Sequence, residues 1–205
     1  MNSKIDTIIF DLGGVLVDWN PQYLYEKIFS TQEEIDWFLN NVCTPDWNIE
    51  QDAGRTIAEA NTIKIKEFPK YSNEIKLFYD RWEEMFSGPI HKSVEIQQKL
   101  LKSPNYRVYA LTNWSAETWD RGRNLFPFLN DFEGVIVSGQ EKMRKPYDEI
   151  YQLIINRFNI TPENSVFIDD NYENTVAATK NGINSIHFKT SEKLLIDLQK
   201  LNVII

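Results

Sequence analysis

The chain has 205 residues, one cysteine and a formal net charge of −8. This length suits one domain, or one domain with an insertion, and a single cysteine excludes a disulfide framework or a thiolate metal cluster. The negative charge argues against nucleic acid or an anionic membrane as a partner, and no stretch is apolar enough to span a bilayer. We expect a cytoplasmic protein, monomer or homodimer, in which Cys43 is a packed or surface thiol without a catalytic role.

Five short apolar segments predict buried strands of a parallel sheet. They are Lys4–Phe10, Arg107–Leu111, Gly134–Val137, Ser165–Ile168 and Ser185–Phe188. Helical patterns lie between most of them, over His91–Lys102, Ser115–Leu125, Pro146–Phe158 and Tyr172–Asn181. Alternating strands and helices are typical of an α/β fold, here a three-layer Rossmann-like core with a parallel five-stranded sheet.

The connection between the first two strands is about ninety residues long, far beyond an ordinary crossover. It has helical spacing almost throughout, with a capping box at Thr31–Glu34. Two further helices are predicted over Ile49–Phe68, interrupted by Gly54, and over Tyr71–Phe86. We therefore predict a helical cap domain at residues 18–88, inserted into a core domain formed by residues 1–17 and 89–205.

Polar side chains follow three of the predicted strands. Asp11 follows the first strand, Thr112 and Asn113 the second, and Asp169 and Asp170 the fourth. Parallel strands of an open sheet bring such residues to one edge, where ligands bind. Three carboxylates in a small volume repel one another unless a cation joins them, and Mg²⁺ prefers oxygen ligands. The sequence therefore predicts a magnesium site at this edge.

Two further features complete the predicted site. Gly13 and Gly14 follow Asp11 and allow the backbone to turn tightly beside a ligand. Lys145 belongs to the basic run that follows the third strand, on the same edge of the sheet. Its ammonium group can neutralise a phosphate oxygen or the Asp11 carboxylate.

FDLGGVLVD, LTN, the lysine of RKP and FIDDNYEN resemble, in this order, the four motifs of the haloacid dehalogenase-like hydrolases. The resemblance runs from Ile5 to about His187, and the inserted helices lie where that family carries its first type of cap. Within the family the chain is most similar to small sugar-phosphate phosphatases of the α-glucose-1-phosphate phosphatase-like group. The resemblance implies Mg²⁺-dependent hydrolysis of a small phosphomonoester, such as a sugar phosphate.

The resemblance also implies a role for each residue of the site. Asp11 would attack phosphorus and become an aspartyl phosphate. Thr112 and Asn113 would bind phosphate oxygens, Lys145 would hold both nucleophile and phosphate, and Asn174 would support the acidic loop. The implied metal ligands are Asp11, the Gly13 carbonyl, Asp169 and Asp170.

The chain departs from the family at Gly13, where most of its phosphatases carry a second Asp that acts as general acid and base. One interpretation is a phosphatase whose substrate needs little help, such as a sugar with an anomeric leaving oxygen. The other is a catalytically weak protein that binds or senses a phosphorylated ligand. Asp18 is five residues further on, but we expect it at the hinge of the cap.

The cap is expected to supply substrate contacts from the stretch between Trp47 and Arg55, with these two residues as candidates. The alternative is that Trp47 packs in the cap interior and Arg55 is a surface cation. Three other functions stay open. A dehalogenase needs no metal, a phosphosugar mutase usually needs the missing Asp, and a receiver domain carries its acidic pair at the first strand.

Overall fold

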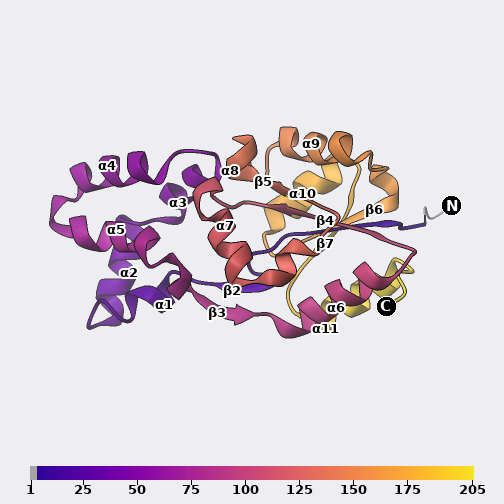
Figure 1. Ribbon diagram of the computed structural model, residues 1–205, viewed down its shortest axis with the longest axis horizontal. Coiled ribbons are helices and arrows are strands. Elements are labelled where there is room, and N and C mark those ends of the chain that lie inside the picture. The colour runs from indigo at the N-terminus through magenta and orange to yellow at the C-terminus, as the bar shows by residue number, and fades with distance from the viewer. Residues whose placement is uncertain (1–3) are drawn as a thin grey trace.

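The computed structural model describes residues 4–205, and a five-stranded parallel sheet forms the centre of one half of the molecule (Figure 1). The strands lie in the order β5 (Gly134–Val137), β4 (Arg107–Thr112), β1 (Thr7–Phe10), β6 (Ser165–Asp169) and β7 (Asn184–His187). Each pair of neighbours is parallel. The predicted fold class is confirmed, although the first strand begins at Thr7 instead of Lys4.

Alternate side chains of the central strands divide between the two faces of the sheet. Ile8 and Phe10 pack in one apolar cluster, whereas Ile9 packs in the other, together with Phe167. Helices α6 (His91–Lys102) and α11 (Ser191–Lys200) contribute side chains to the first cluster, and α9 (Asp148–Phe158) and α10 (Tyr172–Lys180) to the second. The sheet is therefore buried on both faces, which explains its nearly continuous apolar strands.

The remaining core elements are short or lie at the sheet edge that carries the site. They are α7 (Ala116–Leu125), α8 (Ser138–Glu141) and the 3₁₀ turns η3 (Pro127–Asn130) and η4 (Pro162–Asn164). Helix α9 begins at Asp148, two residues after the predicted start at Pro146, because the backbone of Tyr147 is still extended. No helix within residues 4–205 has both the length and the apolar character needed to cross a bilayer.

The inserted segment forms the other half of the molecule, at the left of Figure 1. Its elements are β2 (Val17–Trp19), α1 (Gln22–Tyr25), α2 (Gln32–Asn41), α3 (Pro45–Asp52), α4 (Ile57–Glu67), η1 (Pro69–Tyr71), α5 (Ser72–Asp80), η2 (Trp82–Met85) and β3 (Phe86–Pro89). Aromatic side chains fill its interior, with the rings of Tyr25 and Phe38 4.7 Å apart. Strands β2 and β3 pair antiparallel where the segment leaves and rejoins the core. The limits 18–88 stay a prediction.

Helix boundaries in this segment differ from the predicted ones. The pattern over residues 49–68 belongs to two helices, because Gly54 adopts a left-handed backbone (φ +98°) and Thr56 caps a new helix by accepting from the Glu59 N–H. The predicted helix over residues 71–86 ends at Asp80 and continues as η2. The capping box at Thr31 is present as predicted.

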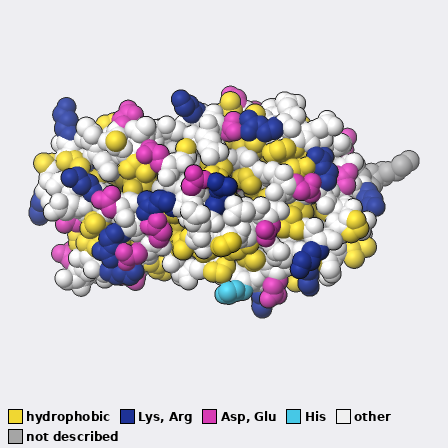
Figure 2. All heavy atoms as spheres, viewed as in Figure 1, with side chains coloured by type: hydrophobic (Ala, Val, Ile, Leu, Met, Phe, Trp, Pro, Cys, Tyr) yellow, Lys and Arg dark blue, Asp and Glu magenta, His cyan; other side chains and the backbone are white. Residues whose placement is uncertain are grey.

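Polar contacts hold the inserted helices against the core beside the sheet edge. From α7, Arg121 donates to the Tyr79 carbonyl at 2.7 Å and forms an ion pair with Glu83. Glu117 of the same helix accepts a hydrogen bond from the Ile57 N–H at 2.7 Å. On the face shown in Figure 2, acidic and basic side chains are interspersed, without one continuous basic patch.

Candidate active site

Three carboxylates lie together at the carboxyl ends of β1 and β6. Asp11 follows β1, Asp169 is the last residue of β6, and Asp170 comes next. Because the two strands are neighbours, with Phe10 paired to Ile168, oxygens from the three carboxylates lie within 4.8 Å of one another. Asp11 and Asp169 are buried, and Asp170 is exposed. This set of oxygen donors suits Mg²⁺.

Lys145 places a buried cation between two of these carboxylates. Its Nζ lies 2.9 Å from an Asp11 oxygen and 2.7 Å from an Asp169 oxygen. Burial alone would lower the pKa of Lys145, but the attraction of the two carboxylates outweighs burial and raises it. The lysine therefore stays charged and fixes the orientation of the Asp11 carboxylate.

One lysine does not neutralise three carboxylates. Burial raises the pKa of Asp11 to about 8; Lys145 opposes this rise, while Asp169 and Asp170 add to it. A bound dication relieves such crowding of negative charge. The residues present therefore fit the predicted magnesium, which when bound offsets charge on the nucleophile and on a phosphate.

Two asparagines hold the charged groups in place. The Asn113 side chain accepts from the Lys145 N–H at 2.9 Å and donates to the Lys145 carbonyl at 3.1 Å. The Asn174 side-chain amide donates to both Asp169 oxygens, at 3.0 and 3.1 Å, and the Asn174 main-chain carbonyl accepts from the Tyr151 hydroxyl. These bonds fix the backbone of the lysine and one carboxylate before any ligand binds.

Thr112 and the turn at Gly13 and Gly14 lie at the same edge of the sheet as these charged residues. Thr112 is the last residue of β4, and its buried hydroxyl has no hydrogen-bond partner within residues 4–205, so it is free to bind a ligand oxygen. Gly14 has a left-handed backbone (φ +69°), and a Cβ there would lie 2.6 Å from the Asp170 carboxyl carbon. Only glycine therefore lets this turn pass so close to the acidic loop.

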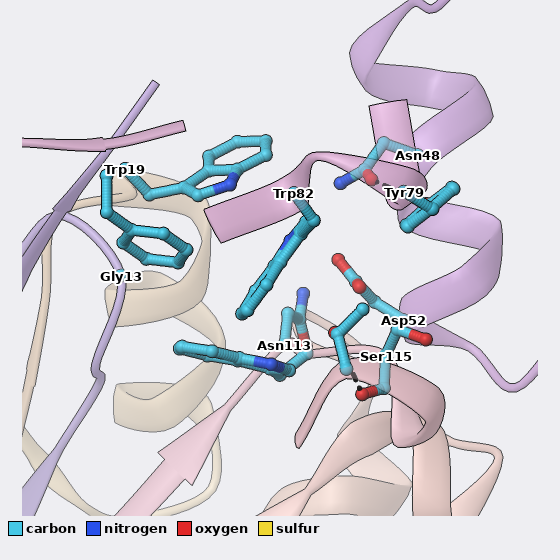
Figure 3. Close-up of a pocket in the computed structure, with 11 residues that line it drawn as sticks. Gly13, Trp19, Asn48, Asp52, Tyr79, Trp82, Asn113 and Ser115 are labelled. Atoms are coloured by element: carbon cyan, nitrogen blue, oxygen red, sulfur yellow. Dashed lines mark hydrogen bonds between the residues drawn. The ribbon is translucent and has the colours of Figure 1, made fainter. Parts of the chain in front are cut away.

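A cavity opens beside this group, between the inserted helices and the sheet edge (Figure 3). Its empty space, counted out into open solvent, is about 460 Å³. Its lining joins residues of both halves of the molecule: Gly13, Trp19, Asn48, Asp52, Tyr79, Trp82, Phe86, Asn113, Trp114, Ser115 and Thr118. Figure 3 shows the Asp52 carboxylate pointing into this space, on the side of Trp82 and Asn113. A small organic ligand next to Asp11 would lie here.

The structure does not bring the two predicted cap contacts, Trp47 and Arg55, to this cavity. Trp47 is buried in the interior of the inserted segment, with its ring 5.1 Å from that of Phe78. Arg55 donates to the Gln51 side chain and to the Trp47 carbonyl, both at 2.7 Å. Both residues thus stabilise the end of α3, and their predicted substrate contact has no support in this geometry.

Sequence reasoning missed the two α3 residues that do line the cavity. Asn48 and Asp52 lie one helical turn apart and share a face of α3. Their i, i+4 spacing, just before the break at Gly54, was a usable signal. It does not reveal which face of α3 meets the core, because that depends on how the inserted helices dock.

The sequence model of the haloacid dehalogenase-like hydrolases matches residues 5–182, which is most of the chain. The chain belongs to the haloacid dehalogenase-like hydrolases. The predicted family and the hydrolase class are confirmed. Among its curated relatives, a sesquiterpene phosphatase of Aspergillus oryzae is 26% identical over 98% of both chains. A phosphorylated carbohydrates phosphatase of Thermotoga maritima is 26% identical, over 89% of this chain and 84% of its own.

Solved structures of this family share the fold over nearly the whole chain. A family enzyme from Bacteroides thetaiotaomicron is 27% identical, with a TM-score of 0.70 over 92% of this chain and 95% of its own. That enzyme was also solved in complex with magnesium and inorganic phosphate (26% identity, TM-score 0.69, 91% and 95% covered). A Porphyromonas gingivalis protein at 22% identity and a TM-score of 0.77 covers 99% and 100%, and shows the fold alone.

Proposed function

We propose that this hydrolase is a magnesium-dependent phosphatase that transfers the phosphoryl group of a small sugar phosphate to Asp11 and then to water. One observation carries the proposal: the Asp11 carboxylate, held by Lys145 within a cluster of carboxylates able to hold a metal ion, lies beside a cavity lined by aromatic and polar side chains. The phosphatase names of the relatives support it, as does the magnesium and phosphate complex of the Bacteroides enzyme.

Each residue then has a chemical task. The free Asp11 oxygen attacks phosphorus and gives an aspartyl phosphate, which divides one difficult displacement into two easier ones. Lys145 and the unpaired Thr112 hydroxyl hold phosphate oxygens, and Asn113 keeps Lys145 in place. Magnesium would be held by Asp11, the Gly13 carbonyl, Asp169 and Asp170, where it supplies positive charge to the transferring phosphoryl group.

The cavity lining supports a neutral, hydroxylated leaving group. Aromatic rings from Trp19, Trp82 and Trp114 can stack on a sugar ring, and Asn48 and Asp52 offer hydrogen bonds to hydroxyl groups. The indole N–H groups of Trp19 and Trp114 are buried and have no acceptor within residues 4–205. No lysine or arginine of the described chain lines the cavity, so a second phosphate group would find no cation there.

A catalytically weak phospho-ligand-binding protein is the second candidate, because Gly13 stands where the family's acid and base would be. It predicts phosphate binding without turnover. The cavity does not separate the two candidates by itself, since both need the same ligand contacts.

A panel of phosphate compounds with and without Mg²⁺ tests both candidates. We expect Mg²⁺-dependent phosphate release from glucose 1-phosphate and related sugar phosphates, in preference to farnesyl phosphate and pyrophosphate. Asp11→Asn should lower turnover to below about a thousandth of the wild-type rate, because the nucleophile is lost, while the circular dichroism spectrum stays unchanged.

Asp18→Asn is the matched control, since Asp18 accepts from the Tyr23 hydroxyl at 3.0 Å in the hinge region and does not line the cavity. This variant should retain activity. Full turnover by Asp11→Asn would refute the assigned nucleophile. Phosphate binding without release from any compound would instead favour the second candidate.

A further inference from the structure

The cavity contains one carboxyl group that the phosphoryl transfer described above does not use. Asp52 is the last residue of α3, and its side chain points into the space that Gly13 and Asn113 also line (Figure 3). Of the described residues that line this cavity, Asp52 is the only one with an acidic or basic side chain. It forms no ion pair with any residue of the described chain.

The reaction at this site leaves one proton unassigned. When the bond between phosphorus and the leaving oxygen breaks, its electron pair goes to that oxygen, which must gain a proton unless it is a weak base. Position 13 offers no acid. The Tyr79 hydroxyl is already committed, because it donates to Asn48 and accepts from Gln51.

The surroundings of Asp52 suit a carboxyl group that carries a proton near neutral pH. Burial raises the pKa of Asp52 to about 7, opposed by the positive charges of Lys145 and Arg144 and by the Ser115 N–H. The other titratable group that faces it is the Tyr79 hydroxyl, from α5. A general acid works best when its pKa lies near the working pH.

We propose that Asp52 protonates the leaving-group oxygen, in place of the acid that the family carries where this chain has Gly13. The inference rests on the proposed phosphatase function. As Asp11 bonds to phosphorus, the ester bond breaks and the Asp52 proton passes to the leaving oxygen, which gives an alcohol and an Asp52 carboxylate. Water then attacks the aspartyl phosphate and returns a proton to Asp52, which gives inorganic phosphate and restores both side chains.

The placement of Asp52 on the inserted segment links this acid to the docking of the cap. Two residues later, Gly54 packs so closely on the core that a Cβ would lie 2.8 Å from the Lys142 side chain and 3.3 Å from the Gly139 carbonyl. The α3 end that carries Asp52 is therefore pressed against the core. The acid reaches the leaving group only when the two halves are together, so protonation is confined to a covered substrate.

Two aryl phosphates of similar size but different leaving groups test the role of Asp52. 4-Nitrophenoxide leaves without protonation, whereas phenoxide needs it. We expect Asp52→Asn to lower kcat/KM for phenyl phosphate by about 100-fold and for 4-nitrophenyl phosphate by less than about threefold. The value of kcat/KM depends only on the steps up to release of the phenol or nitrophenol, so later hydrolysis of the aspartyl phosphate does not affect the comparison. In the wild type, the phenyl phosphate value should also fall more steeply above about pH 7, and this difference should vanish in the variant.

Asn48→Ala is the matched control on the same face of α3. It removes a cavity contact without removing a proton donor, so both substrates should lose similar activity. Equal losses on both substrates in Asp52→Asn would overturn the role of acid and make Asp52 a binding residue. If the wild type releases phosphate from neither the aryl phosphates nor any sugar phosphate with Mg²⁺, the proposed function itself fails. Equal losses in an active enzyme overturn the role of Asp52 alone, so the two failures are distinguishable.

Discussion

The Asp52 carboxyl group is costly to ionise where the structure holds it. The unfolded chain ionises an aspartate near pH 4, whereas the folded chain keeps this one protonated up to about pH 7. Between these values the folded state binds the extra proton, so the free energy of unfolding falls as pH rises. Asp52→Asn removes this loss. We expect the variant to be more stable than the wild type by on the order of 1–2 kcal/mol at pH 8, and by much less at pH 4.

Urea unfolding at several pH values measures the difference in free energy of unfolding between the variant and the wild type. Asn48→Ala is the control, because the stability difference that it causes should not depend on pH. A gain for Asp52→Asn that is equal at pH 4 and pH 8 would contradict the assigned environment. If removal of this carboxyl group stabilises the protein, the site follows a common pattern in which a functional group lowers the stability of the fold.

At the same scale, the sequence predicts some site residues and misses others for one physical reason. Asp11, Thr112 and Asp169 end parallel strands, and the sheet brings strand ends together whatever the rest of the chain does. Asn48 and Asp52 lie on a helix whose orientation depends on docking between the two halves. Nothing local to α3 encodes that docking, so its cavity-facing side was not predictable.

At the scale of elements, the turn after β1 and the loop after β6 fit together through Gly14. A Cβ at this position would lie 2.6 Å from the Asp170 carboxyl carbon, and φ is +69°. Gly14→Ala should therefore displace Asp170, a predicted metal ligand, and weaken Mg²⁺ binding by about tenfold, or about 1.4 kcal/mol. Isothermal titration with Mg²⁺ alone measures this affinity without any substrate.

Gly88→Ala is the control that has the unfavourable backbone conformation of Gly14→Ala without its steric clash. Gly88 also has a positive φ, +133°, but no heavy atom lies within 4 Å of the place that a Cβ would take there. Both variants should lose stability because alanine disfavours this backbone region, yet only Gly14→Ala should lose Mg²⁺ affinity. Equal Mg²⁺ affinity in the two variants would show that Asp170 is not a metal ligand.

Some helix boundaries are set by hydrogen bonds between nearby residues, and others lie where the chain contacts the core. The capping box at Thr31 was predicted because its hydrogen bonds lie within four residues. The helix predicted over residues 49–68 carried an interruption at Gly54, and the chain breaks there into α3 and α4, where α3 meets the core closely. The glycine marks the position of the break, but helical periodicity does not record the contact with the core.

At the scale of the whole molecule, apolar packing continues from the core into the inserted segment. The Trp82 ring of η2 lies 5.5 Å from that of Trp114, which follows β4, and the Phe86 ring lies 6.0 Å from the same indole. One apolar cluster accordingly contains residues of both halves, among them Ile8 of the core and Phe78 of the inserted segment. We infer that the two halves unfold together, even though the β2–β3 connection can act as a hinge.

Cys43 reports on this cooperativity because it is the single cysteine and lies inside the inserted segment. The residue is 2% exposed, and burial raises the pKa of its thiol to about 12, against the opposing effects of Tyr25 and Lys64. The native thiol should therefore react very slowly with Ellman's reagent. Labelling of Cys43 at increasing urea should follow the same transition as the loss of circular dichroism, which reports the secondary structure of the whole chain.

Opening of the hinge alone leaves Cys43 covered by the helices of the inserted segment, so it causes no labelling before the main transition. Fast labelling well below the main transition would show that the inserted segment unfolds alone, and that the aromatic contacts around Trp114 do not couple the two halves.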